Sequence, residues 1–518
     1  MPQTVTITLS PKQAADIKLC TCIAARTLGI SDRDIALVRT LKRSVDARRG
    51  NPKVLLTLEV YADREPLPQP IHFDYPDVRH GTPVAVIGAG PAGLFAALTL
   101  IELGLRPVIF ERGKDVSTRK RDIAAINRNQ AIDPDSNYAF GEGGAGTFSD
   151  GKLFTRSKKR GDYNKVLQTL VFHGAGDEIL YEAHPHIGSD RLPQIIAAIR
   201  KTIVAAGGDF FFNKRVTGLK ISRERIAGVV CGDETFDVAA AILATGHSAD
   251  DIYVMLHRAG IALEAKPFAM GVRVEHPQQL INDIQYRRAA DADYLPAAAY
   301  SLVAQVAGRG VYSFCMCPGG FIVPAMTDAA QSVVNGMSPS ERNSPFANSG
   351  IVTEIRLSDF AHLTGEFGAL AGLEFRRRIE EAAREYGGRS QTAPAQRLAD
   401  FVTGGMSATL PATSYIPGIT LSDFGSWLPP FMVGALRGGF SDFGRKMHGF
   451  VTNQAIIAGV ESRTSTPVRI PRDAQTLMHT QVEGLFPAGE GAGYAGGIVS
   501  AALDGQRTAA ATAKYLRL

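Results

Sequence analysis

The chain is poor in cysteine and tryptophan, and it carries little net charge. Of its 518 residues, five are cysteine and one is tryptophan. An odd, low cysteine count in a chain of this length argues against a disulfide framework and favours a reducing compartment. The formal net charge of +5 neither requires nor excludes a polyanionic partner. These counts predict a cytoplasmic globular protein of roughly two to four domains.

One apolar stretch, residues 84–105, is long enough to cross a bilayer and contains a single charged residue, Glu102. Glycines and a proline interrupt it, and a second strand pattern follows at once. We therefore interpret it as a buried strand and helix. The first ten residues lack the apolar core of a secretory signal. We expect neither a membrane span nor a leader.

The same stretch contains the most informative motif of the chain. A β-branched run ends in G-x-G-x-x-G, a helical pattern follows, and Glu111 closes a second apolar run. This is the layout of a dinucleotide-binding βαβ unit, in which the helix N-terminus receives the phosphates and the acid receives the ribose hydroxyls. The alternative is a glycine-rich turn in an ordinary α/β domain. The predicted phosphate-binding residues are Gly88, Ala89, Gly90, Pro91, Ala92 and Gly93.

Two distant stretches favour FAD over NAD. Residues 242–246 (ILATG) and 484–490 (GLFPAGE) resemble the Ala-Thr-Gly and C-terminal Gly-Asp motifs of flavoproteins with a glutathione-reductase-type FAD domain. Taken alone, Ala-Thr-Gly can equally be a plain strand end. A helix starting after the second motif would favour the anionic reduced flavin. The further cofactor contacts that we expect are Glu111, Arg112, Gly144, Val216, Ala244, Thr245, Gly246, Gly489, Glu490, Gly496, Gly497 and Ile498.

NADP does not suit the first motif, because Glu111 would repel its 2′-phosphate. The chain has no second G-x-G-x-x-G. If NADH or NADPH donates electrons, we expect it to bind transiently, without a second domain of this kind.

Longer strings resemble an uncharacterised family of bacterial FAD-dependent dehydrogenases over nearly the whole chain. The resemblance implies an FAD oxidoreductase fold with a fused N-terminal domain, and it implies no particular substrate. The strings are KRSVDAR at 42–48, FGEGGAGTFSDGKL at 140–153, HPHIGSD at 184–190, MCPGG at 316–320 and RNSPFANS at 342–349.

The patterns predict an α/β protein with a discontinuous Rossmann-like FAD-binding domain, an inserted α+β substrate lobe and a small N-terminal α/β sandwich. The expected N-terminal helix begins at Ser10 and ends near Leu28, with Cys20 and Cys22 in its core. The segment from 112 to 190 is expected to be irregular. The domain ranges are 1–80, 81–265, 266–439 and 440–518, of which the second and fourth form the FAD-binding domain.

Few residues suggest catalysis. Lys152 could stabilise reduced flavin, although its glycine-dense segment could also be a mobile surface loop. Cys317, with Cys315, could be a thiol near the flavin or a small buried thiol, and a regular strand would hold the two too far apart for an unstrained disulfide. His448, with its basic neighbours, could face an anionic substrate or be ordinary surface charge. We expect no metal, and interpret His184 and His186 as a turn pair.

Two basic clusters could bind nucleic acid or be solvated faces. One lies within 39–49 and the other contains Arg156, Lys158, Lys159 and Arg160. Neither has the aromatic residues that stack on bases. We favour an FAD-dependent oxidoreductase that moves a hydride between a small organic substrate and flavin N5. The alternatives are a flavin-dependent RNA-modifying protein and a non-catalytic flavin-bound sensor.

Overall fold

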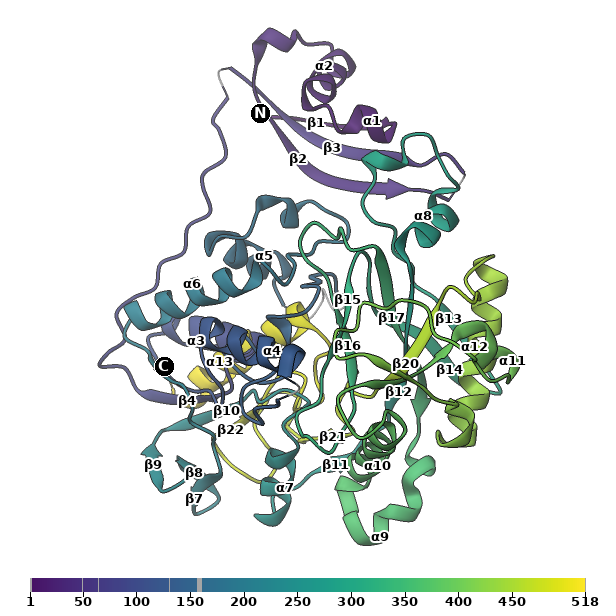
Figure 1. Ribbon diagram of the computed structural model, residues 1–518. Coiled ribbons are helices and arrows are strands. Elements are labelled where there is room, and N and C mark those ends of the chain that lie inside the picture. Colours follow the sequence, from purple (N-terminus) through teal and green to yellow (C-terminus); the bar gives the residue numbers. More distant parts are fainter. Residues whose placement is uncertain (1, 49, 64, 130, 156–160, 518) are drawn as a thin grey trace.

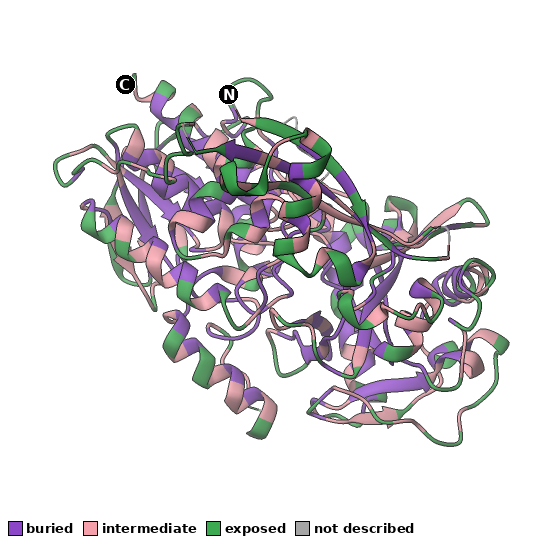
Figure 2. Ribbon diagram, turned by 90° about the horizontal axis from the view of Figure 1, so that it is seen from above, coloured by how far each residue is buried: buried purple, intermediate pink, exposed green. Residues whose placement is uncertain are grey.

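The computed structural model describes residues 2–48, 50–63, 65–129, 131–155 and 161–517. A small N-terminal unit sits on a larger body, and an extended segment, 65–82, runs along the outside of the body between them (Figure 1). Buried residues follow the strands of the body, and exposed residues follow the outer turns of its helices (Figure 2). The second basic cluster predicted from the sequence lies outside the described residues.

The N-terminal unit is a three-stranded antiparallel sheet in the order β1-β3-β2, with two helices on one face. Alternate residues of β1 and β3 are buried, which is the pattern of a sheet covered on one side. Its elements are β1 (Gln3–Leu9), α1 (Pro11–Ala14), α2 (Ile17–Leu28), β2 (Ile35–Asp46) and β3 (Lys53–Ala62).

The N-terminal helix differs from its prediction. The capping box of Ser10 and Gln13 is present, but the helix stops after Ala14. Asp16 then caps a second helix by accepting a hydrogen bond from the Leu19 N–H at 3.1 Å. A new helix axis begins there, and Cys22 is exposed rather than in the core.

A five-stranded parallel sheet in the order β22-β10-β4-β5-β6 forms the centre of the body. Strand β4 is buried on both faces, as expected for a parallel sheet covered on both sides. Helices α3, α5, α6 and α13 cover one face, whereas β7–β9 and α7 cover the other. The strands are β4 (Pro83–Ile87), β5 (Arg106–Phe110), β6 (Asp209–Phe211), β10 (Ala240–Leu243) and β22 (Leu485–Pro487). The covering elements are α3 (Pro91–Glu102), α5 (Tyr163–Phe172), α6 (Leu192–Ala205), β7 (Gly218–Ser222), β8 (Arg225–Cys231), β9 (Glu234–Asp237), α7 (Asp250–Arg258) and α13 (Ile498–Tyr515).

The segment from 112 to 190 is more regular than we expected. It contains α4 (Val116–Asn129) as well as α5. Among the described helices, none combines the length and the hydropathy that crossing a bilayer requires.

A second, seven-stranded sheet has the order β13-β14-β17-β12-β20-β18-β19 and is antiparallel except for the β18–β19 pair. Its strands are β12 (Phe268–Pro277), β13 (Val303–Val306), β14 (Arg309–Cys317), β17 (Phe346–Ile355), β18 (Ala393–Arg397), β19 (Ile419–Leu421) and β20 (Ile456–Glu461). The accompanying elements are β11 (Glu264–Ala265), α8 (Gln278–Tyr286), β15 (Phe321–Pro324), β16 (Val334–Met337), α9 (Thr364–Phe367), α10 (Ala371–Tyr386), α11 (Leu398–Thr403), α12 (Pro430–Lys446) and β21 (Val468–Arg469).

The expected boundary at residue 440 does not coincide with a break in this second unit. It falls inside α12, whose apolar side packs into the core of the seven-stranded sheet. Strand β20, which lies beyond that boundary, pairs with β12. The chain therefore returns to the parallel sheet only after β20.

Candidate functional site

A cavity of about 380 Å³ opens at the carboxyl ends of β4, β10 and β22. In open parallel sheets ligands bind at this edge, where loops from adjacent strands diverge. Most of the residues predicted to contact the cofactor share its lining. They are Gly88, Ala89, Gly90, Pro91, Ala92, Glu111, Arg112, Gly144, Val216, Ala244, Thr245, Gly246, Glu490, Gly496, Gly497 and Ile498.

Two predicted cofactor contacts, Gly93 and Gly489, lie behind this lining. A Cβ on Gly93 would stand 1.9 Å from the Gly88 carbonyl oxygen, and one on Gly489 would stand 2.9 Å from Ala92 Cβ. Both glycines therefore allow α3 to pack closely against the turns around it. Their contribution to the cavity is indirect.

Two helix N-termini open into the cavity without a capping side chain. Gly90 precedes α3 and Gly497 precedes α13, and neither residue offers a side-chain acceptor to the first turn. A Cβ on Gly90 would be 3.9 Å from its nearest protein neighbour, and one on Gly497 would have none within 4 Å. Open backbone with free N–H groups fits a diphosphate and an anionic ring edge. The site therefore offers backbone donors of the kind that the diphosphate and the flavin ring of FAD require.

The Glu111 carboxylate holds the loops around this site. It accepts hydrogen bonds from the backbone N–H groups of Ala89 at 2.9 Å, Gly113 at 2.9 Å and Gly141 at 3.1 Å. A carboxylate has about four lone-pair positions, so room remains for one further donor. The ribose contact predicted from the sequence would share this carboxylate with the backbone.

Arg119 is a residue that sequence reasoning missed. It is fully buried, and its guanidinium donates to the carbonyl oxygens of Asn137 at 2.8 Å, Tyr138 at 3.0 Å and Gly144 at 2.8 Å. It also donates to the carbonyl oxygens of Gly141 and Glu142. The glycine-rich loop therefore wraps one arginine, which places Gly144 beside Gly90. Arg119 is one of several basic residues on α4, and nothing in the local sequence indicates that this one is buried.

Glu490 and His247 lie side by side in the cavity wall. His247 Nε2 is 3.5 Å from Glu490 Oε2. Burial raises the pKa of Glu490 to about 7 and lowers the pKa of His247 to about 4. Near neutral pH the pair can therefore hold a proton on the carboxyl while the imidazole is uncharged.

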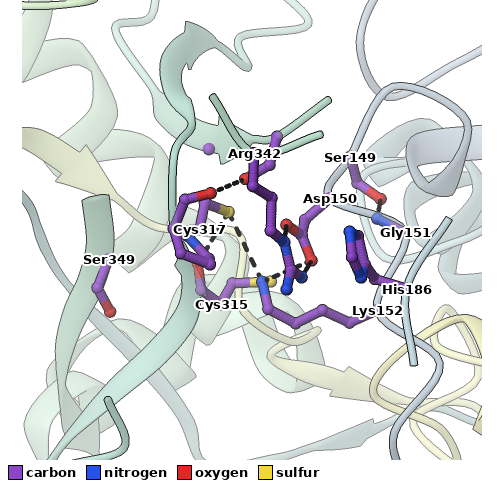
Figure 3. Close-up of polar contacts among 12 residues, drawn as sticks. Ser149, Asp150, Gly151, Lys152, His186, Cys315, Cys317, Arg342 and Ser349 are labelled. Carbon is purple, nitrogen blue, oxygen red and sulfur yellow. Dashed lines mark hydrogen bonds and ion pairs between the residues drawn. The ribbon is translucent and has the colours of Figure 1, made fainter. Parts of the chain in front are cut away.

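Away from the dinucleotide motif, the cavity reaches a cluster built on Asp150, which Figure 3 shows. Arg342 grips this carboxylate with two nitrogens, at 2.7 and 3.2 Å, and the Lys152 ammonium lies 3.3 Å from it. Burial opposes ionisation of Asp150, but the charges of Lys152 and Arg342 outweigh it and lower the pKa to about 2. The cluster joins a loop of the parallel-sheet unit to a loop of the seven-stranded unit.

The other candidate residues are divided between the cavity and the surface. Lys152 and Cys315 line the cavity, and Cys317 is buried just behind them. His448 is exposed after the end of α12, off the lining, so the structure does not support a catalytic role for it. His186 is half-buried and contacts the Ser340 carbonyl oxygen at 3.0 Å. Among the described residues, no group of three or more potential ligands could hold a metal ion.

Comparison with known proteins establishes the family. A protein of Clostridium beijerinckii is 39% identical over 505 residues, which cover 93% of each chain. Models of an FAD binding domain and of the C-terminal domain-like region of FAD-dependent proteins match residues 81–128 and 267–464, and a domain of unknown function matches residues 1–61. The chain belongs to this family of FAD-dependent proteins. The narrower assignment to the glutathione-reductase-type superfamily stays a prediction.

Solved structures give only weak likenesses. The flavin-dependent brominase Bmp2 is 12% identical, with 84% of this chain and 79% of that chain covered and a TM-score of 0.37. CtdE in complex with FAD is 11% identical, with 83% of each chain covered and a TM-score of 0.30. A geranylgeranyl bacteriochlorophyll reductase-like protein from Thermoplasma acidophilum is 14% identical, with coverages of 84% and 79% and a TM-score of 0.33.

Proposed function

We propose that this protein is an oxidoreductase that binds FAD in the cavity and moves a hydride between a small organic substrate and flavin N5. One observation carries the proposal. The cavity gathers the Gly88–Ala92 turn, the Ala244–Gly246 strand end, and Glu490 with Gly496 and Gly497, which are far apart in the chain. Each of these three stretches was predicted separately to touch the same cofactor.

Different groups along the cavity would bind different parts of FAD. The N-terminus of α3 would hold the diphosphate, and the Glu111 carboxylate, fixed by three N–H groups, would take a ribose hydroxyl. The N-terminus of α13 and the Lys152 ammonium would stabilise negative charge at the ring end. When bound, FAD supplies the two-electron chemistry that amino-acid side chains lack.

The substrate would enter where the two units of the body meet. Asp150, Lys152, Cys315, Asn335 and Arg463 line that part of the cavity. The first two come from the parallel-sheet unit, and the others from the seven-stranded unit or the chain that leaves it. Such a wall can exclude water and orient a polar substrate.

Cofactor loading tests the proposal first. Purified protein should be yellow, or should become so when FAD is added to the apoprotein, with about one FAD per chain. A colourless protein that cannot be reconstituted would refute it. Anaerobic photoreduction followed by exposure to electron acceptors then separates an enzyme from a flavin-bound sensor, because only the enzyme reoxidises repeatedly with a substrate.

The electron donor is tested by rapid mixing. NADH or NADPH is mixed anaerobically with the loaded protein while the flavin absorbance is followed. Bleaching within seconds with one of them identifies a nicotinamide donor. If neither bleaches the flavin, the donor is another reductant.

The RNA-modifying alternative has less support from the structure. Three arginines of the basic cluster within 39–49 form ion pairs instead of standing free: Arg39 with Glu59, Arg43 with Glu182 and Arg48 with Asp46.

A further inference from the structure

Two cysteines meet one lysine at the end of the cavity. Cys315 lines the cavity, and Cys317 is buried behind it. The Lys152 ammonium lies 3.7 Å from Cys317 Sγ, and Figure 3 shows both thiol side chains pointing toward it. The Cys317 thiol also donates to the Cys315 carbonyl oxygen at 3.3 Å, so it folds back over its neighbour. The proposed hydride site does not require this arrangement.

The chain between the cysteines is not a regular strand. The pairing of β14 with β17 slips between Phe314 and Cys317, as in a β-bulge, and Cys315 has a left-handed φ of 49°. A regular strand would keep the two thiols too far apart for a disulfide. The two cysteines therefore do not lie on a regular strand, and the Cys317 thiol turns back toward the backbone of Cys315.

The positive charge of Lys152 next to the two thiols favours the formation of a thiolate. Burial alone would lower the pKa of Lys152, but the neighbouring Cys317 and Asp150 raise it, so the side chain stays an ammonium. Burial raises the pKa of the Cys315 thiol to about 11, which keeps it protonated at rest. A fixed ammonium next to sulfur stabilises the negative charge that develops on a thiol as it loses its proton.

We propose that Cys315 and Cys317 form a redox-active dithiol that exchanges electrons with the flavin. This inference rests on the proposed function, because it needs FAD as the oxidant. As the S–S bond forms, both S–H bonds break, and the thiols give up two electrons and two protons. The oxidised flavin takes both electrons and one proton at N5, and the second proton leaves through the cavity to solvent. The reverse transfer restores the two thiols.

The first test counts electrons. The loaded, air-oxidised protein is titrated anaerobically with dithionite while flavin absorbance and total uptake are followed. A flavin plus a disulfide takes up four electrons per chain, whereas a flavin alone takes up two. We expect four for the wild type and two for C315S and for C317S. The matched control is C231S, which removes a buried cysteine of β8 outside the cavity lining and should still take up four.

The second test needs no variant and no turnover. The protein is denatured with an alkylating reagent before and after reduction, and its labelled cysteines are mapped by mass spectrometry. We expect three labelled cysteines in the air-oxidised protein, with Cys315 and Cys317 protected, and all five after reduction. If a serine variant fails to fold, the number of labelled cysteines in the wild type still shows whether Cys315 and Cys317 form a disulfide.

Two results would distinguish failure of the redox-active dithiol from failure of the proposed FAD site. A protein that takes up FAD but only two electrons, with five free thiols throughout, overturns the dithiol and leaves the flavin site intact. A protein that cannot bind FAD overturns the flavin site and the dithiol with it. Uptake of four electrons by C317S would also contradict the dithiol, because the extra pair would then have another source.

Discussion

Gly90 and Gly144 are in close backbone contact in the cavity lining: a Cβ on Gly144 would lie 3.1 Å from Gly90 Cα. The first belongs to the turn that starts α3, and the second to the loop wrapped around Arg119. Their contact brings two chain segments together without side chains between them. It leaves backbone, rather than bulky groups, at the place where the proposed diphosphate would lie.

Gly90→Val should abolish FAD retention while the apoprotein stays folded. Gly90 has φ −76° and ψ −176°, which any residue adopts, and its Cβ position is nearly open. The added side chain would therefore occupy the cofactor's space without straining the backbone. Bound flavin is measured by absorbance after gel filtration, and the fold by thermal unfolding of the apoprotein. Gly434→Val, at an exposed position of α12, is the control and should keep its flavin. Full retention by the Gly90 variant would mean that the diphosphate binds elsewhere.

Arg119→Met should destabilise the protein by at least about 3 kcal/mol, because several buried carbonyl groups would lose their donor. The loop that it holds should also become sensitive to protease, and FAD should bind more weakly. The free energy of unfolding is measured with urea. Arg128→Met, on the exposed side of the same helix, should change stability by less than about 0.5 kcal/mol. Equal effects from both substitutions would contradict a specific role for Arg119.

The Glu490 carboxyl should contribute a loss of apoprotein stability as the pH rises from about 4.5 to 7, so Glu490→Gln should gain stability relative to the wild type across this interval. Burial raises the pKa of Glu490 from 4.5 to about 7. Over that interval the folded state keeps a proton that the unfolded state releases, so rising pH favours unfolding, by up to about 3 kcal/mol. Thermal unfolding across the interval measures it. The exposed control Glu366→Gln should keep the wild-type slope. A wild-type slope in Glu490→Gln would show that the carboxyl titrates normally.

Replacing Arg273 or Glu461 alone should destabilise the protein more, per substitution, than replacing both residues together. The two side chains are fully buried and 2.7 Å apart, and Arg273 also contacts Asn348 at 2.7 Å. Removing either charge alone leaves the other buried without its partner, which costs about 3–5 kcal/mol. We expect R273M and E461Q each to lose that much in urea unfolding, and the double variant to lose less than the sum. Strict additivity would show that the two charges are not coupled.

Local signals predicted much of the parallel-sheet unit. The βαβ unit, the buried strand before Thr245 and the helix after Gly497 each follow from periodicity and glycine placement within a short stretch. The single long helix after Ser10 was wrong, because Asp16 competes for backbone N–H groups and starts a new helix. Strand β14 is also not regular through Cys315 and Cys317, because its pairing with β17 shifts register between Phe314 and Cys317.

By itself the sequence determined the dinucleotide turn and the family, because these depend on residues close together in the chain. Only the tertiary structure decided which distant side chains meet. Asp150 and Arg342 are 192 residues apart in the chain. They meet because a loop of the parallel-sheet unit packs against a loop of the seven-stranded unit beside the cavity. The same packing puts Lys152 beside Cys317 and leaves His448 outside. Such contacts depend on the relative position of whole sheets, which no local pattern specifies.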